Sequence, residues 1–376
     1  MPQFVRNDII SLLGDAPLHD LAESVGPNLR LGELLGADNS WKEASLGYAT
    51  AAGAPALRAA IADLHGVDAD DVVVTVGGIH ALFLLGYILC GRGEEAVITT
   101  PVFPPARDTL VSVGAELRAL PLGFDGNYQL DPEKLASLLS PATRLVSLAS
   151  PQNPSGVALR RAALVDVLSA MATRCPGAVL LIDETYRFAV YGDDAIIPSV
   201  ATLSPQVVVT GSLSKCHGVP GVRIGWAITR NAKLREQLMI AKFGTVISNS
   251  AVDEMLGLRV LRQADTIIGE RRRRLGEGLA HTAAWVEDNA ALVEWIRPDA
   301  GALCCIRLRP DAFDAAGVMR FYSGLSRSNA RVGDGSWFGE EPRVFRLGFG
   351  LLAPAELDAA LDVLTTTLHQ ARPNAA

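Results

Sequence analysis

The 376-residue sequence predicts an α/β protein, in which a mostly parallel sheet wrapped by helices is followed by a smaller α+β domain. Two observations lead to this prediction. Strand and helix patterns alternate between about residues 45 and 260. A chain of this length that is 49% hydrophobic and 20% charged forms a large core and typically divides in two. We expect an N-terminal arm that is part of the small domain (1–41), a large domain (42–265) and a C-terminal small domain (266–376).

Composition excludes several classes of protein. A net charge of -7 argues against a non-specific nucleic-acid binder, and the one basic run, Arg271 to Arg274, is expected on a solvated helix face. The five cysteines have neither CxxC spacing nor an even count, so we expect no zinc site, no disulfide framework and a cytoplasmic location. The first residues lack the features of a secretory signal.

The first predicted strand covers residues 72–76. Before it, residues 1–40 are interrupted by turn signals, and Tyr48 precedes a helix. Residues 72–91 are apolar over about the length of a membrane span, but Gly77-Gly78 and His80 interrupt them, which favours strand, glycine turn and a buried helix from residue 80 to 90. Glycines before a helix start expose N–H groups, an arrangement that binds phosphate. We expect His80 to pack near such a site rather than to act as a base.

The next strands lead into stiff or polar loops. After the strand at residues 96–100, prolines hold Phe103, which could equally be a core phenylalanine. Asn153 lies in PQNPSG at a strand's carboxyl end, where open α/β sheets bind ligands, although turn asparagines are common. A helix is expected at 158–173. The strand VLLID then ends at Asp183, whose burial without a cationic partner would be costly, and Tyr186 follows.

Residues 211–226, GSLSKCHGVPGVRIGW, follow a strand at 207–210 and form the most informative stretch. Lys215 has no acidic neighbour, so burial would lower its pKa and leave a nucleophilic amine suited to Schiff-base chemistry. Arg223 offers a planar fork for phosphate, and Ser212 adds a hydroxyl donor. One loop would therefore hold an aldehyde covalently and its phosphate ionically. Cys216 is expected to be a small packing residue.

The last part of the chain reads as a long helix at about 249–288, strands at 302–307 and 344–348, and a final helix at 354–371. Arg346 lies within the apolar strand VFRLGFG. A lone strand arginine is usually a surface residue whose guanidinium reaches water. Its role therefore depends on what the rest of the chain resembles.

The run SxSKxxGxxGxRxGW resembles the lysine loop of class I/II aminotransferases, pyridoxal 5'-phosphate (PLP) enzymes of fold type I with a seven-stranded large-domain sheet. PQNPSG and RLGFG resemble further motifs of that family, and the similarity runs from about Tyr48 to Gly350. The resemblance implies these roles: Lys215 carries PLP; Asp183 pairs with the pyridine nitrogen; Asn153 and Tyr186 reach the phenolic oxygen; Phe103 stacks on the ring; Gly78, Ile79, Ser212, Ser214 and Arg223 hold the phosphate; Tyr48 reaches the phosphate of the partner subunit in a homodimer; and Arg346, with Asn153, binds the substrate carboxylate.

The activity implied first is transamination between an amino acid and a 2-oxo acid. The alternative is elimination, cyclisation or oxidative deamination, because residues 26–40, which include Glu33, are similar to the same stretch of capreomycidine synthase-type members. Glu33 could equally be a helix-surface carboxylate. A PLP-binding regulator would need its own helix-turn-helix segment, for which we find no stretch of sequence. Retention of Lys215, Asp183, Tyr186 and Arg346 together favours chemistry over a non-catalytic homologue.

Overall fold

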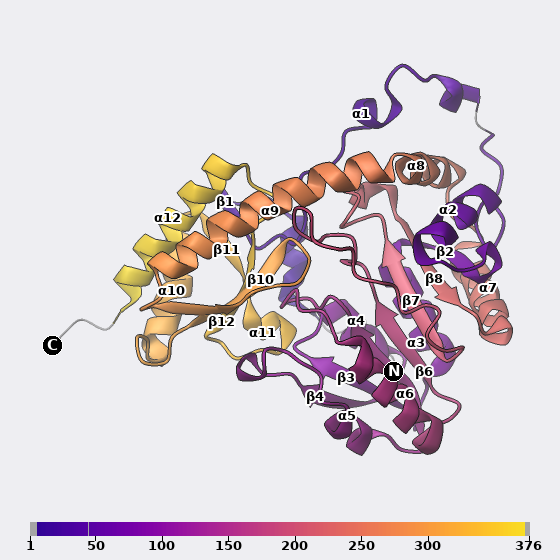
Figure 1. Ribbon diagram of the computed structural model, residues 1–376, viewed down its shortest axis with the longest axis horizontal. Helices are drawn as coiled ribbons and strands as arrows, with labels where there is room; N and C mark the ends of the chain where they lie inside the picture. Colours follow the sequence, from indigo (N-terminus) through magenta and orange to yellow (C-terminus); the bar gives the residue numbers. More distant parts are fainter. Residues whose placement is uncertain (1–5, 44, 373–376) are drawn as a thin grey trace.

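The computed structural model describes residues 6–43 and 45–372, and Figure 1 shows two sheets joined by a long helix. Residues 1–5 of the predicted arm, Ala44 and residues 373–376 lie outside the described residues. The boundaries of the three predicted parts stay a prediction. The structure shows which strands form each sheet and that the N-terminal segment joins the smaller sheet.

The larger sheet has seven strands in the order β2-β8-β7-β6-β5-β3-β4. β8 is antiparallel to both of its neighbours, whereas the other neighbouring strands are parallel, which confirms the predicted mostly parallel sheet. The strands are β2 Val72–Val76, β3 Glu95–Thr100, β4 Glu116–Pro121, β5 Thr143–Ala149, β6 Val179–Asp183, β7 Val207–Ser212 and β8 Ile224–Thr229.

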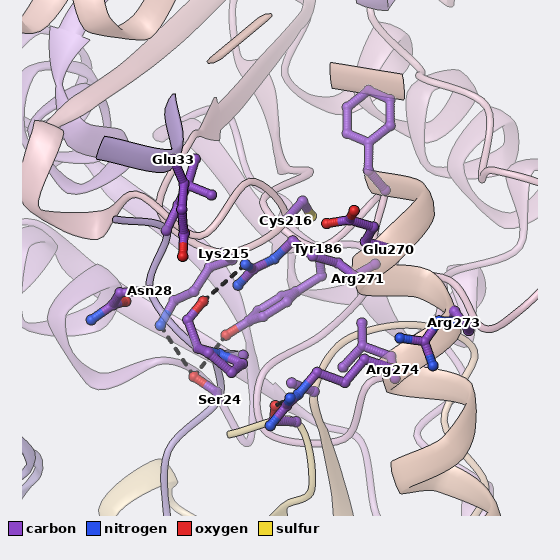
Figure 2. Close-up of a pocket in the computed structure, with 18 of the residues that line it drawn as sticks. Ser24, Asn28, Glu33, Tyr186, Lys215, Cys216, Glu270, Arg271, Arg273 and Arg274 are labelled. Atoms are coloured by element: carbon purple, nitrogen blue, oxygen red, sulfur yellow. Dashed lines mark hydrogen bonds between the residues drawn. The ribbon is translucent and has the colours of Figure 1, made fainter. Parts of the chain in front are cut away.

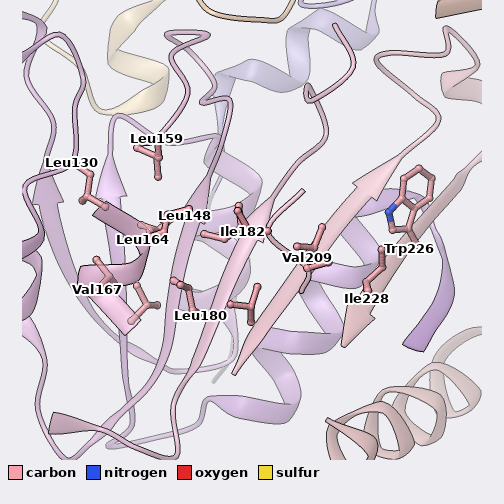
Figure 3. Packing of buried hydrophobic residues seen from close by; sticks show 14 of the residues in the cluster. Leu130, Leu148, Leu159, Leu164, Val167, Leu180, Ile182, Val209, Trp226 and Ile228 are labelled. Atoms are coloured by element: carbon pink, nitrogen blue, oxygen red, sulfur yellow. The ribbon is translucent and has the colours of Figure 1, made fainter. Parts of the chain in front are cut away.

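Both faces of this sheet are buried because its strands are almost continuously apolar. Successive residues point to opposite faces, so Leu180 and Ile182 belong to one core cluster while Leu181 belongs to another. Figure 3 shows the first cluster from close by, including Trp226 of β8. Layers of helices on both faces are the arrangement expected for a parallel sheet.

Helices supply both layers. Those whose apolar residues join the first cluster include α2 Pro55–His65, α5 Pro132–Leu138, α6 Arg161–Arg174 and α8 Ala251–Arg262. Those on the other face are α3 Gly77–Leu89, α4 Pro104–Ser112 and α7 Ala232–Val246.

The second sheet has five strands in the order β1-β11-β12-β10-β9, and its first strand comes from the N-terminal segment. The strands are β1 His19–Leu21, β9 Val293–Ile296, β10 Leu303–Leu308, β11 Ala330–Asp334 and β12 Val344–Gly348. Its helices are α9 Ala264–Asp288, α10 Ala315–Arg327, α11 Gly335–Phe338 and α12 Pro354–Ala371. The sequence analysis located β10 and β12 but not β1, β9 or β11.

Short elements occupy the connections. They are α1 Leu31–Leu35 and the 3-10 helices η1 Asp8–Leu13, η2 Ser40–Glu43, η3 Ala69–Asp71, η4 Phe124–Gly126 and η5 Pro220–Val222. No helix within residues 6–43 and 45–372 combines the length and apolar character needed to cross a bilayer.

Three predicted helix boundaries were wrong, each for a local reason. α3 begins at Gly77 rather than His80, because the helix follows β2 directly. α6 begins three residues late, since the amides of Ala158 and Leu159 donate instead to Asp299 and Ser150. The predicted helix at 249–288 is two helices, α8 and α9. At the break, the Gln263 amide donates to the carbonyl of Val260, three residues earlier, in a 3-10-type bond.

Gly225 of β8 faces the start of α3 so closely that it provides a stability test. A β-carbon there would overlap the carbonyl carbon of Gly77 and the nitrogen of Gly78. We expect Gly225→Ala to cost about 1–3 kcal/mol of stability through overpacking, measured as a lower unfolding midpoint in urea. Gly221→Ala is the matched control, since a β-carbon at Gly221 meets nothing within 4 Å. Equal midpoints for the two variants would contradict the prediction.

Candidate active site

Lys215 lies in the loop between β7 and β8, hereafter the lysine loop. The loop closes on itself through a hydrogen bond from Leu213 N to Ile224 O (3.0 Å), and Gly218 has a positive φ of 70° that suits glycine. The Lys215 Nζ donates to the Ser24 hydroxyl at 3.2 Å. Burial lowers the pKa of Lys215 to about 8, and the positive charge of Arg346 adds to the effect. The chain therefore holds an amine that is partly neutral near physiological pH.

Two cavities meet at Lys215 and Ser24, which line both. The first cavity, about 820 Å³, also contacts Tyr186, the segment from Gly26 to Glu33 and the arginines of α9. The second cavity, about 770 Å³, is lined by Phe103, Ile79, Arg346 and residues of η1. Lys215 thus faces a polar chamber on one side and a largely apolar one on the other.

Asp183 is a half-buried residue at the end of β6, and its carboxylate faces a narrow cavity shared with Phe103 and Asn153. One carboxylate oxygen accepts hydrogen bonds from the Thr185 amide (3.0 Å) and hydroxyl (2.6 Å). Burial raises the pKa of Asp183, and the Thr185 hydrogen bonds oppose this only in part. None of its bonds within the described residues is an ion pair, so the side chain suits a cationic ligand.

Arg346 of β12 is 2% exposed and reaches towards Lys215 from the second sheet. Its guanidinium donates to the Asn153 side-chain oxygen at 2.9 Å and to the carbonyl of Ala22. The remaining Nε is buried without a partner among the described residues. This guanidinium lies 4.8 Å from the centre of the Phe338 ring. Arg346 is therefore a buried cation with hydrogen-bonding capacity left for an anion, not a surface residue.

Tyr186 is buried, and burial raises its pKa to about 12. The sequence pattern predicted that its hydroxyl points towards a cofactor oxygen shared with Asn153. In this structure the phenol donates to the Ser24 hydroxyl at 3.0 Å (Figure 2), while the Asn153 oxygen accepts from Arg346. The amide nitrogen of Asn153 is the donor that remains for a ligand.

An anion cradle forms where α3 starts beside the lysine loop. A β-carbon at Gly77 would overlap the Arg223 guanidinium, so this glycine lets the arginine lie against the helix terminus. The Arg223 Nη1 approaches Ser214 Oγ (3.5 Å), and Ser214 N donates to Ser212 Oγ (3.3 Å). Gly78 and Ile79 provide first-turn amides at a helix end that has no side-chain cap. This geometry suits a phosphate.

Of two further predicted residues, Tyr48 lies apart from this convergence, whereas His80 lines the second cavity. Tyr48 is 85% exposed and lines none of the three cavities described above, so this chain alone does not bring it to the site. His80 has both ring nitrogens engaged, with Val76 N (3.2 Å) and Thr245 Oγ1 (3.1 Å), and burial lowers its pKa to about 4. These contacts agree with a packing role for His80.

The prediction that Arg271 to Arg274 form a solvated helix face holds for Arg273, which is exposed and pairs with Glu277, but it was wrong for Arg271 and Arg274. Arg271 donates to the Pro27 carbonyl (2.9 Å), and Arg274 donates to carbonyls between Gly350 and Leu352. Loops packed on α9 use these side chains to satisfy their carbonyls. Glu33 lines the first cavity and accepts from the Arg30 amide at 3.0 Å, so it caps α1.

Sequence reasoning missed the contribution of residues 22–24. The carbonyl of Ala22 and the hydroxyl of Ser24 reach Arg346, Lys215 and Tyr186 from more than 150 positions away. A single serine before a Gly-Pro turn carries no recognisable signal. The pairing of β1 with β11, a long-range contact, brings this segment to the site.

Comparison with known proteins gives a consistent result. The protein-family model for class I and II aminotransferases matches residues 34–364. The chain is 27% identical over 315 residues to capreomycidine synthase of Streptomyces vinaceus, covering 83% of this chain and 78% of that one. It is 31% identical over 190 residues to arginine–pyruvate transaminase of Pseudomonas aeruginosa. The latter match spans 48% of this chain and only 47% of that relative.

Solved structures match almost the entire chain. A PLP-dependent aminotransferase from Streptococcus suis superposes with a TM-score of 0.89 at 24% identity, covering 99% of this chain and all of that one, which shows the fold alone. The PLP-dependent cyclase OrfR gives a TM-score of 0.84 at 28% identity, covering 98% and 99% of the two chains. The family and the cyclase neighbour indicate pyridoxal 5'-phosphate as the cofactor.

The Asp183 carboxylate has no ion-pair partner among the described residues, and this leads to a prediction for the stability of the cofactor-free protein. Its folded-state pKa lies above the unfolded value, so the carboxylate lowers stability as pH rises through that interval. We expect Asp183→Asn to raise cofactor-free stability at neutral pH by on the order of 1–3 kcal/mol. The gain should disappear as pH falls to about 4.

Urea unfolding of cofactor-free protein at pH 4 to 8 measures this difference. If Asp183 pairs with the ring nitrogen, as the resemblance implies, the same variant should also bind the cofactor more weakly. If the Asp183→Asn variant unfolds at a lower urea concentration than wild type at neutral pH, the prediction is contradicted. Asp166→Asn is a matched control at an exposed position of α6.

Proposed function

The chain belongs to the class I and II aminotransferase family, and on that premise we propose that it is a PLP-dependent transaminase. It would move the amino group of an L-amino acid to a 2-oxo acid. One observation carries the proposal: Lys215, an amine with a lowered pKa, and Arg346, a buried cation with an unpaired Nε, line the same cavity. They suit the amino and carboxylate ends of one α-amino acid.

The residues present fit the cofactor. Asp183 would hold the ring nitrogen in its protonated form, which gives this buried carboxylate the cation it lacks. Phe103 would cover the ring, and the Asn153 amide nitrogen would donate to its phenolic oxygen. The anion cradle of Gly78, Ile79, Ser212, Ser214 and Arg223 would hold the phosphate. When bound, PLP supplies an aldehyde for Lys215 and a ring that accepts electron density from the substrate α-carbon.

The remaining steps belong to protein side chains. Arg346 would orient the substrate by a charge-assisted bond to its carboxylate, with Asn153 and Ala22 O fixing the guanidinium. The neutral Lys215 amine would take the proton from the α-carbon and later return it at a neighbouring carbon. A pKa of about 8 suits both directions of transfer, because each protonation state is populated near neutral pH.

A second candidate is cyclisation or elimination, in which the substrate's own side chain reacts. Two observations favour it: the similarity to capreomycidine synthase over 83% of the chain and the cyclase fold match. The first cavity adds support, since Asn28, Arg30 and Glu33 bring polar groups close to Lys215. Such walls suit a substrate with a long polar side chain.

The two functions are separated by the requirement for a second substrate. We expect the holoenzyme to convert an amino acid only when 2-oxoglutarate or another 2-oxo acid is present, as followed by chromatography of both products. Lys215→Ala should lower the rate by at least about 100-fold, whereas Lys233→Ala, an exposed lysine of α7, should not. Ammonia or a rearranged amino acid formed without the 2-oxo acid would point to the second candidate.

We also propose a homodimer with shared active sites. α7 exposes Ile240 (65%) and Phe243 (61%), and α3 beside it exposes Tyr87 (66%). Such neighbouring apolar side chains suit burial against a second copy. The chain between α1 and α2, which carries Tyr48, runs outside the packed layers (Figure 1), where the tyrosine could reach a partner's phosphate cradle.

Introducing a charged side chain at the proposed dimer contact tests whether the dimer forms there. Phe243→Asp should halve the mass seen by sedimentation velocity and weaken PLP binding, because the partner's Tyr48 is lost from the cradle. Met319→Asp, at a residue of α10 that is 72% exposed, is the matched control and should remain dimeric. A wild-type protein that sediments as a monomer would refute the proposal.

A further inference from the structure

Ser24 is the point where the N-terminal segment touches the catalytic lysine. It is 4% exposed, and its hydroxyl oxygen is 3.2 Å from Lys215 Nζ and 3.0 Å from the Tyr186 hydroxyl. Figure 2 shows both interactions converging on this oxygen. Because Ser24 lines both large cavities, its side chain stands between them beside the amine.

The segment that carries Ser24 is fixed from several directions. β1 pairs with β11, and Asp20 accepts two hydrogen bonds from Arg331 (3.2 and 2.7 Å). Arg346 donates to the Ala22 carbonyl. A β-carbon at Gly348 would overlap the carbonyl oxygen of Glu23, so the segment lies directly on β12. The position of the hydroxyl is therefore set by the second sheet and not by a free loop.

A hydroxyl suits an amine that changes protonation state. It offers one donor and two acceptor sites, so it can accept from the Lys215 ammonium and from Tyr186 together. When the amine is neutral, the hydroxyl can rotate to donate to the nitrogen lone pair while still accepting from Tyr186. Neither alanine nor glycine offers this pair of contacts, whereas threonine does.

We infer that Ser24 is a positioning residue for Lys215, whose hydroxyl holds the lysine amine in place in both protonation states and links it to Tyr186. The inference rests on the proposed function, because it assumes that Lys215 is the amine that reacts. Three further charged groups act on that amine: Arg346 from β12 opposes its charge, while Glu23 and Asp183 favour it. Cys216 beside it is a buried thiol whose pKa is raised to about 11, so it carries no charge near neutral pH. Ser24 adds a direct hydrogen bond to the charged form.

The test measures Lys215 itself in the full-length, cofactor-free protein. Brief reductive methylation with formaldehyde from pH 6 to 11, with mass spectrometry of the peptide that contains residue 215, gives the midpoint at which the amine becomes reactive. We expect a midpoint near 8 in wild type. A hydrogen bond to the charged ammonium is stronger than one to the neutral amine, so loss of the hydroxyl in Ser24→Ala should lower the midpoint by about one pH unit.

Three further variants make the result specific. Ser24→Thr keeps the hydroxyl and should restore the wild-type midpoint. Ser24→Gly removes it without adding bulk and repeats the test should the alanine protein fail to fold. Ser112→Ala removes a buried hydroxyl that bonds to the Thr109 carbonyl (2.7 Å) and lines neither large cavity, so its midpoint should not move. Circular dichroism checks that each protein is folded.

An unchanged midpoint in Ser24→Ala and Ser24→Gly would overturn the inference, as would a shift that Ser24→Thr fails to reverse. Neither cofactor nor amino acid is present in this measurement. Failure of the proposed transaminase activity would therefore leave a Ser24-dependent midpoint intact, and an active transaminase with a Ser24-independent midpoint would refute only the positioning role.

Discussion

The charge of Lys215 is poorly solvated and is opposed by the nearby cation Arg346, and the rest of the site depends on this condition. An ammonium in such a place loses its proton more readily than one in water. The lysine loop creates the condition because its two ends are joined to adjacent antiparallel strands, β7 and β8. The same strand, β8, lies so close to α3 that only glycine is accommodated at Gly225. The amine and the anion cradle are therefore positioned by one piece of sheet.

Asp183 and Arg346, like Lys215, are charged groups in poorly solvated places, and this property suits them to bind charged ligands. Each is a charged group placed where its charge is costly and left without a full set of partners. Asp183 comes from the larger sheet and Arg346 from the smaller one, so a ligand that satisfies both must lie between the two sheets. Binding energy gained there would offset the cost of burying the two charges in the protein alone.

Much of this could be predicted from local sequence. The strands that lead to Gly77, Asp183 and Lys215 are short apolar runs that end in polar or glycine-rich loops. β6 and β7 pair in parallel, and β2 runs in the same direction because β2 and β7 are both antiparallel to β8, so the three ends lie at one edge of the sheet. Arg346 was identifiable from its motif. By contrast, Ser24 and Ala22 depend on β1 pairing with β11, a long-range contact with no periodic signal. The arginines of α9 were misjudged because their partners are loop carbonyls, which composition does not reveal.

The N-terminal segment has a mechanical consequence. β1, β11 and β12 belong to one hydrogen-bonded sheet, and Arg346 also donates a hydrogen bond to the carbonyl of Ala22. A tilt of that sheet relative to the larger one would carry the guanidinium and the Ser24 hydroxyl as a single rigid body. Binding of a carboxylate to Arg346 that tilts the sheet would then also change the distance between the Ser24 hydroxyl and the Lys215 amine. The two events would be coupled mechanically.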